Sequence, residues 1–535
     1  MPLLTRLTYM FLMSLPLAIA AKAQSDGGTP SQPAKIKMLN STLTMGEDGK
    51  ISRTVHTEFQ VLNSAGVLGV SQFPISYSSQ LVDVDVDDAY TLKSDGRKLP
   101  VDTSAIFTRP QPATAGAPFF NDLMQKVLVF PSVEVGDTLV FDETEHQKQT
   151  AFEGQYLDAR VFSTTMENDA TTLTVSVPST RALNIETKDV SVQKKQEGNR
   201  TTYTFTVSNP KAVIDTNPQL STWDRMPRLY ISTFRSYDEM GHAYAALVAS
   251  KLSVTPRVQA LADQLTDGVK DRREQAKRIY NYVSSKIRYV SIAFGTGAIV
   301  PHDAETVLNN GYGDCKDKVM LLSALLKAKR IASEPVLVNA TNGYTLSGPP
   351  TLAQLNHLIA WLPEFHVYVD ATVQVASFGV LPLEEYGKPV IHAVATGPVQ
   401  HVIPIVQPEA SSISHKTDVT LDESGKLSGI TRVEGTGPFD IRLRLTAIGI
   451  QATGGQRTPY AAIHPRFHFN SPELLDTPFS ITGDFSIDPN PRLLTGDGFA
   501  LPSGTWLVAP WWCPNGSYHA EYDDWSGQYA LLFRP

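Results

Sequence analysis

Alternation of apolar and polar residues restricts the fold of the first half of the chain. Apolar residues recur at every second position in short runs, most clearly over residues 55–61, 173–177 and 203–207. This period of two is typical of β-strands with one buried face. Many short strands separated by turn residues predict an N-terminal antiparallel β-sandwich over residues 36–230.

The period changes to that of helices after Ser236. Four segments carry apolar residues three and four positions apart: residues 244–252, 255–265, 276–287 and 314–329. Shorter strand-like runs follow at residues 335–339, 358–362 and 367–370. Amphipathic helices followed by antiparallel strands predict a central α+β domain over residues 231–378.

Strand signals return in the last third of the chain. Residues 419–421 and 427–433 flank the turn-like sequence of residues 422–425 and predict a hairpin. Prolines are frequent beyond this point, so we expect the strands to be short. The sequence therefore predicts a C-terminal β-rich domain over residues 379–535, and a length of 535 residues agrees with several domains.

The first 23 residues are predicted to be a signal peptide. Arg6 precedes an apolar run over residues 7–20, and residues 21–23 (AKA) have the small–x–small pattern of a cleavage site. The alternative is a retained membrane anchor, but a run of about 14 residues is shorter than the ~20 that cross a bilayer. With residues 24–35 as a flexible lead-in, we expect an exported, periplasmic protein of bacterial type. The mature chain should be soluble, with no transmembrane anchor.

Charge and ligand spacing argue against several classes of partner. The chain has 46 Lys and Arg against 54 Asp and Glu, a net charge of −8, and no basic block, so we expect no nucleic acid partner. No His, Cys or Asp spacing fits a zinc site. The acidic residues within 82–94 suit an exposed strand better than a calcium site. We therefore expect no cofactor and no metal.

The stretch that points to chemistry is residues 311–318 (GYGDCKDK). A turn with two glycines leads into a helical pattern, which places Cys315 in the first turn. Unpaired backbone N–H groups and the helix dipole favour a thiolate there, and a thiolate is the form that attacks carbonyl groups. The alternative is a buried structural cysteine. A disulfide to Cys513, the second of two cysteines, would block attack, but the two lie in different predicted domains.

Two further residues can serve such a cysteine. His357 begins one strand-like run and Asp370 ends the next. Two adjacent antiparallel strands would bring them together, so that the carboxylate holds one imidazole nitrogen while the other faces Cys315. Taken alone, His357 could be a structural histidine and Asp370 a turn residue.

Three motifs in order carry a family resemblance. They are residues 313–317 (GDCKD) before an apolar helix, residues 356–357 (NH) and residues 370–372 (DAT). Over roughly residues 236–378 the chain resembles the bacterial transglutaminase-like superfamily. More narrowly, it resembles the group in which this core follows an N-terminal β domain of undefined function, DUF3857, which residues 133–137 (VEVGD) match more weakly.

The resemblance implies a transglutaminase- or papain-like core whose catalytic triad falls on Cys315, His357 and Asp370. Cys315 would form a thioester with a carboxamide or peptide carbonyl, and His357 would protonate the leaving amine. The Cys315 N–H would hold part of the oxyanion, with Tyr289 and Ser291 as candidates for the second donor. Asp314 and Lys316 flank the nucleophile and are expected to tune it or cap the helix, and Asp317 and Lys318 are expected to be solvated or ion-paired rather than catalytic.

The function expected from these features is an exported, cysteine-dependent acyltransferase, amidase or peptidase. Its substrate would be a protein, a peptide or a cell-wall peptide. Hydrolysis and transamidation stay open, because one thioester serves both, and no residue indicates the oligomeric state. The alternative is a non-enzymatic scaffold of the cell envelope built on the same core.

Overall fold

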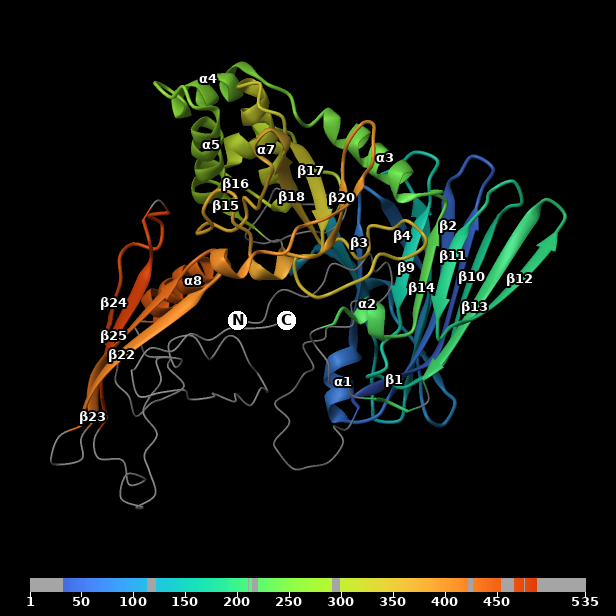
Figure 1. Cartoon of the computed structure of the whole chain (residues 1–535). Coiled ribbons are helices and arrows are strands. Elements are labelled where there is room, and N and C mark those ends of the chain that lie inside the picture. Colours follow the sequence, from blue (N-terminus) through green and yellow to red (C-terminus); the bar gives the residue numbers. More distant parts are fainter. Residues whose placement is uncertain are drawn as a thin grey trace.

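The computed structural model describes residues 32–112, 122–209, 211–213, 220–290, 299–421, 427–453, 466–475 and 477–487. The predicted signal peptide, most of the lead-in and Cys513 lie outside these residues. Within them the chain is rich in strands, with an N-terminal β domain, a central α+β region and a C-terminal sheet (Figure 1). This confirms the predicted fold class.

The N-terminal domain is built on an eight-stranded sheet in the order β12-β13-β10-β1-β2-β8-β4-β5. Its strands are β1 (Ala34–Met45), β2 (Ile51–Val61), β4 (Val82–Leu92), β5 (Lys98–Pro100), β8 (Thr138–Gln147), β10 (Asn168–Pro178), β12 (Ser191–Glu197) and β13 (Arg200–Asn209). All neighbours are antiparallel except β1 and β10, which are parallel. Strand β4 exposes its acidic residues, Asp83, Asp85, Asp87 and Asp88, as the sequence predicted.

Two three-stranded sheets and two short helices complete this domain. One sheet has β3 (Gln72–Ser78), β6 (Ile106–Pro110) and β7 (Leu123–Val129), and the other has β9 (Leu157–Val161), β11 (Asn184–Lys188) and β14 (Arg228–Ser232). The helices are α1 (Ser64–Val70) and α2 (Thr222–Arg225). Phe73 packs against Phe59 and Phe141 with ring centroids 5.5 and 4.9 Å apart, so the small sheet of β3 shares a core with the large one.

The central region packs helices against a five-stranded sheet in the order β19-β18-β17-β20-β21. The helices are α3 (Tyr237–Ala249), α4 (Pro256–Leu265), α5 (Arg272–Lys286), α6 (Ala304–Asn310) and α7 (Cys315–Ala328). The strands are β17 (Glu334–Val338), β18 (His357–Leu362), β19 (Val367–Val369), β20 (Pro389–His392) and β21 (Gln400–Val402), and a separate parallel pair joins β15 (Arg288–Tyr289) to β16 (Tyr312–Gly313). The four predicted helices are present. Strands β20 and β21 extend the sheet beyond residue 378.

Helix α7 differs from the amphipathic helix that the sequence predicted. Every residue from Cys315 to Leu326 is buried, including the charged residues of the first turn. The helix lies between the neighbouring helices and the sheet, in the largest apolar cluster of the described chain. A helix enclosed on all sides needs internal partners for its charges, and these partners shape the candidate site.

The C-terminal sheet has the order β22-β23-β25-β24. Its strands are β22 (Ile413–Leu421), β23 (Leu427–Gly435), β24 (Arg466–His468) and β25 (Ser480–Ile487). Strands β22 and β23 pair in antiparallel fashion, as the hairpin pattern predicted. Helix α8 (Pro438–Thr453), which was not predicted, packs Leu443 and Ala447 against Phe479 and Ile481. Among the described helices, none combines the length and apolar character needed to cross a membrane.

Candidate active site

Cys315 occupies the first position of α7, and the residues around it form a closed cap. Asp314 Oδ1 accepts hydrogen bonds from the N–H groups of Lys316, at 2.9 Å, and Asp317, at 3.2 Å. Asp317 Oδ2 accepts one from the Asp314 N–H at 3.2 Å, which completes a reciprocal capping box. A Cβ on Gly313 would lie 2.5 Å from Cβ of Asp317, so this cap requires glycine there.

The cap leaves one amide of the first turn free. The N–H groups of Lys316, Asp317 and Lys318 are all bonded to Asp314, the last to its carbonyl oxygen. The Cys315 N–H has no acceptor among the described residues. It is therefore the one donor of this turn that can serve a negatively charged oxygen beside the sulfur.

The charged residues of the cap are buried and partnered inside the protein. Lys316 Nζ lies 2.6 Å from Asp314 Oδ2. Burial lowers the pKa of Lys316, but the Asp314 carboxylate outweighs burial and raises that pKa well above its usual range. Asp317 Oδ1 accepts a hydrogen bond from the backbone N–H of His302 at 2.9 Å and lies 3.1 Å from the ring nitrogen Nδ1 of the same residue. Asp317 is thus buried rather than solvated, and its side-chain partner is His302.

Lys318 corrects the prediction that it is solvated or ion-paired. Its side chain is fully buried, and Nζ donates to the carbonyl oxygens of Ser284, at 3.1 Å, and Ile287, at 2.8 Å. Burial lowers the pKa of Lys318 to about 8. The sequence could not reveal this, because only the enclosure of α7 removes Lys318 from water.

His357 and Asp370 lie together, as the strand pattern predicted. Strand β18 begins at His357, and Asp370 directly follows β19, which pairs with β18 in antiparallel fashion. His357 Nε2 lies 3.0 Å from Asp370 Oδ2. The other oxygen, Oδ1, accepts from the N–H and Oγ1 of Thr372 at 2.8 and 2.7 Å. The carboxylate is therefore held from two sides while it orients the imidazole.

The electrostatics of this pair favour an imidazolium beside a carboxylate. Burial lowers the pKa of His357, but Asp370 and a hydrogen bond to Cys315 outweigh it and raise that pKa well above its usual range. Burial raises the pKa of Asp370, yet His357 and the Thr372 donors lower it to about 2. Cys315 carries a free thiol with 4% of its surface exposed. The side chains of Cys315, His357 and Asp370 thus converge from α7, β18 and the end of β19.

Of the two residues expected as second oxyanion donors, the structure describes only Tyr289. Tyr289 lies in β15, directly opposite Gly313 of β16, so its backbone runs beside the segment that leads into Cys315. Ser291 lies outside the described residues, as does Cys513. The oxyanion role of Tyr289 and Ser291 is not tested by this geometry and stays a prediction, and Cys315 is a free cysteine, so the alternative of a Cys315–Cys513 disulfide is not favoured.

Glu385 is a neighbour of this group that the sequence did not indicate. It ends the short 3₁₀ helix η6 (Leu383–Glu385) and is 1% exposed. Side-chain atoms of Glu385, His357 and Asp370 all lie within 4.8 Å of one another. Metal sites also show such spacing, but His357 and Asp370 are already bonded to each other, so we assign no metal here. No motif marks Glu385, because its position depends on a loop between two strands.

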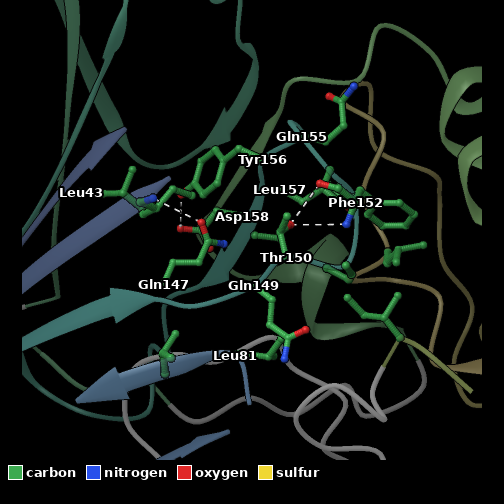
Figure 2. Close-up of a pocket in the computed structure, with 18 of the residues that line it drawn as sticks. Leu43, Leu81, Gln147, Gln149, Thr150, Phe152, Gln155, Tyr156, Leu157 and Asp158 are labelled. Carbon is green, nitrogen blue, oxygen red and sulfur yellow. Dashed lines mark hydrogen bonds between the residues drawn. The ribbon is translucent and has the colours of Figure 1, made fainter. Parts of the chain in front are cut away.

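A cavity of about 210 Å³ lies between the N-terminal domain and the central region (Figure 2). On the side of the β domain, Arg53 pairs with Glu145 at 3.2 Å and approaches Asp158 at 3.8 Å. On the side of the central region, the lining includes Val300 and Leu352. These two residues closely precede His302, which binds the α7 cap, and His357. The cavity therefore borders both chain segments that lead into the candidate site.

Comparisons with known proteins agree with this arrangement. Residues 47–214 match the family model of DUF3857, a domain of unknown function with a solved structure, and residues 259–372 match that of the transglutaminase-like superfamily. The chain therefore carries a DUF3857 domain followed by a transglutaminase-like core, as its motifs indicated. No curated protein matches the chain in sequence.

Solved structures support the fold. A crystal structure of a candidate protease from Parabacteroides distasonis superposes with a TM-score of 0.60 at 16% identity, covering 85% of this chain and 93% of that one. An M1 zinc metallopeptidase from Deinococcus radiodurans has a TM-score of 0.20 at 11% identity, covering 37% of this chain and 42% of that one. Of these two structures, the first is close enough to show a common fold, and the second carries no argument.

Proposed function

We propose that this chain, a DUF3857 domain followed by a transglutaminase-like core, is a cysteine-dependent peptidase, amidase or acyltransferase. The observation that carries the proposal is the convergence of Cys315, His357 and Asp370. Two contacts support it: His357 Nε2 lies 3.0 Å from Asp370 Oδ2, and the free cysteine Cys315 is near enough to His357 to act on its pKa. A carboxylate on one ring nitrogen and a cysteine beside the imidazole are the partners that nucleophilic catalysis requires.

The chemistry follows from these positions. With the thiol proton already on His357, the Cys315 thiolate attacks the carbonyl carbon of a carboxamide or peptide, and a C–S bond forms. The C–N bond then breaks, and His357 gives the proton to the departing amine. Water or a second amine attacks the resulting thioester and releases an acid or a new amide. The free Cys315 N–H stabilises the oxyanion in both steps.

Peptides are the substrate class that we favour. The fold neighbour is described as a candidate protease, and the cavity between the domains has apolar walls near the segments that lead to Cys315 and His357. An apolar side chain of an extended peptide would suit such walls. Export through the predicted signal peptide would place the enzyme among envelope proteins and cell-wall peptides.

The scaffold alternative has one specific observation in its favour, the small exposed surface of Cys315. A sulfur with 4% exposure could also be a packed core residue. Iodoacetamide distinguishes the two functions, because a nucleophile paired with an imidazole reacts faster than an ordinary thiol.

The test uses the wild type, Cys315→Ala and Cys513→Ser, with the labelled residue located by mass spectrometry. We expect rapid labelling of Cys315 in the wild type and in Cys513→Ser, and none at that site in Cys315→Ala. In a peptide library, the wild type should cleave or modify peptides, and Cys315→Ala should not. Labelling confined to Cys513, with equal turnover in both proteins, would overturn the proposed function.

A further inference from the structure

The proposed mechanism leaves one buried acid next to its carboxylate without a role. Glu385 is buried. One carboxylate oxygen of Glu385, one carboxylate oxygen of Asp370 and one ring nitrogen of His357 all lie within 4.8 Å of one another. Two carboxyl groups this close in a dry site do not both ionise readily, because each charge opposes the other.

Hydrogen bonding shows which of the two acids carries charge. Asp370 is supplied with donors by Thr372 on one oxygen and by His357 on the other. Glu385 Oε2 is buried and has no hydrogen-bond partner among the described residues. An ionised carboxylate with an orphaned buried oxygen is strongly unfavourable, whereas a protonated one can donate its O–H to a neighbouring acceptor.

Other charged and titratable groups around Glu385 are engaged elsewhere. Lys388 Nζ donates to the Asn339 carbonyl oxygen at 2.6 Å, and burial lowers the pKa of Lys388 to about 8. The Tyr280 hydroxyl donates to the carbonyl oxygens of Asp370 and Ala376, both at 3.1 Å.

Tyr386 and Lys318, the other titratable neighbours, also have hydrogen-bond partners other than Glu385. The Tyr386 hydroxyl accepts from the Leu381 N–H at 3.1 Å. Lys318, which acts electrostatically on Asp370 from α7, donates to two backbone carbonyls. None of these groups forms a salt bridge with Glu385 among the described residues, so Asp370 is the available acceptor for its proton.

We propose that Glu385 is held as a neutral carboxylic acid that donates a hydrogen bond to Asp370 and thereby positions the carboxylate for His357. This inference rests on the proposed function. The directions of the two pKa values agree with it: burial and Asp370 raise the pKa of Glu385 well above its usual range, whereas that of Asp370 is lowered to about 2. Glu385 is a positioning residue, because it acts on the imidazole only through Asp370.

The test compares Glu385→Gln, Glu385→Ala and, as a matched control, Glu384→Gln on the adjacent exposed residue. The rate of Cys315 alkylation by iodoacetamide is measured against pH, which needs no knowledge of the substrate. Glutamine keeps a donor for Asp370, so Glu385→Gln should react within about threefold of the wild type at neutral pH. Glu385→Ala should be slowed by roughly 10- to 100-fold, because a misplaced catalytic group costs that much.

The pH profile adds a readout that a purely structural role would not move. Once the wild type ionises Glu385 at alkaline pH, the donor is lost and the rate should fall below that of Glu385→Gln, which cannot ionise. Glu384→Gln should follow the wild type throughout. Equal slowing by glutamine and alanine would show that the charge is required, and an unaffected Glu385→Ala would show that the residue has no positioning role. Either result overturns the inference.

Infrared spectroscopy provides a test that does not depend on the alanine variant folding. The difference spectrum between the wild type and Glu385→Gln at neutral pH should contain the carbonyl band of a protonated carboxylic acid. Carboxylate bands alone would overturn the inference. An unreactive Cys315 in the wild type would instead overturn the proposed function, and the infrared band would still decide the state of Glu385.

Discussion

His357 Nε2 and Asp370 Oδ2 lie 3.0 Å apart in a site where both side chains are almost fully enclosed. The pair links the start of β18 to the residue that follows β19, its antiparallel neighbour. Because water is largely excluded, the mutual attraction of the two groups is strong, and so is the penalty when one of them is lost.

The stability of the pair should depend on pH in a defined way. The pKa of Asp370 is lowered from 3.8 to about 2, so its contribution is present above 3.8 and disappears as the pH falls toward 2. The pKa of His357 is raised above 6.5, so its contribution is complete below 6.5 and disappears as the pH rises through the folded value. The two contributions overlap fully between pH 3.8 and 6.5.

Asp370→Asn should therefore lower the free energy of unfolding most within that window, by about 3–5 kcal/mol. The difference from the wild type should shrink on both sides of it. Asp83→Asn, which removes an exposed partner of Lys148, should cost at most about 1 kcal/mol. Urea unfolding from pH 3 to 9 measures these values, and a difference that does not vary with pH would contradict the assignment.

Loss of the imidazole should abolish most of the activity without unfolding the protein. His357→Gln removes the acid–base group, so kcat should fall by roughly 10²–10⁴-fold while KM changes little. His392→Gln is the matched control, because His392 is also buried in this sheet but bonds to Glu334 and Tyr368 instead. Steady-state kinetics measure the loss of activity, and thermal unfolding shows whether either variant is less stable. Equal losses of kcat in both variants would count against the role of His357.

The buried cap of α7 should be far more sensitive than an exposed cap. Asp314→Ala removes two helix-capping bonds and leaves the Lys316 ammonium buried without its partner, so we expect a loss of about 3–5 kcal/mol. Asp271→Ala removes only the exposed cap of α5 and should cost about 1 kcal/mol. Similar losses for the two variants in chemical denaturation would show that the Asp314–Lys316 pair does not stabilise the core.

Two neighbouring acids in β8 should respond in opposite directions. Burial and Glu145 raise the pKa of Glu143 from 4.5 to about 8, so its stabilising effect is present below 4.5 and is lost as the pH rises to 8. Glu143→Gln should thus be neutral at acidic pH and stabilise by on the order of 3 kcal/mol at pH 8. Burial raises the pKa of Glu145 as well, but this acid pairs with Arg53, so Glu145→Gln leaves a buried guanidinium without that partner and should destabilise by about 3–5 kcal/mol.

Denaturation of both variants at pH 5 and pH 8 tests this contrast. The wild type is the common reference, and the positions are two residues apart on one strand, so general effects of glutamine substitution cancel. Stabilisation by Glu145→Gln, or none by Glu143→Gln at pH 8, would show that the charges are assigned to the wrong residues.

Local patterns in the sequence predicted the elements that carry Cys315, His357 and Asp370. The start of α7 follows from Asp314 and the preceding glycines, and the strand pattern places His357 and Asp370 at facing ends of β18 and β19. These features depend on capping, periodicity and short-range pairing, which are visible over a few residues.

Features that depend on distant packing could not be predicted in this way. Burial of Lys318 requires the enclosure of α7 on all sides, and the place of Glu385 requires a loop to fold back next to His357 and Asp370. The parallel pairing of β1 with β10 joins strands more than a hundred residues apart. Helix α8 was missed because its apolar residues sit among strand formers and polar residues without a clear helical stripe.

Trapping of the acyl-enzyme tests the central claim most directly. Wild-type protein and Cys315→Ala are incubated with an activated acyl ester, quenched in acid and examined by intact-mass and peptide mass spectrometry. We predict one acyl group attached to Cys315 in the wild type, released by hydroxylamine, and no such adduct in Cys315→Ala. Product formation at equal rates in both proteins, with no adduct on Cys315, would contradict it.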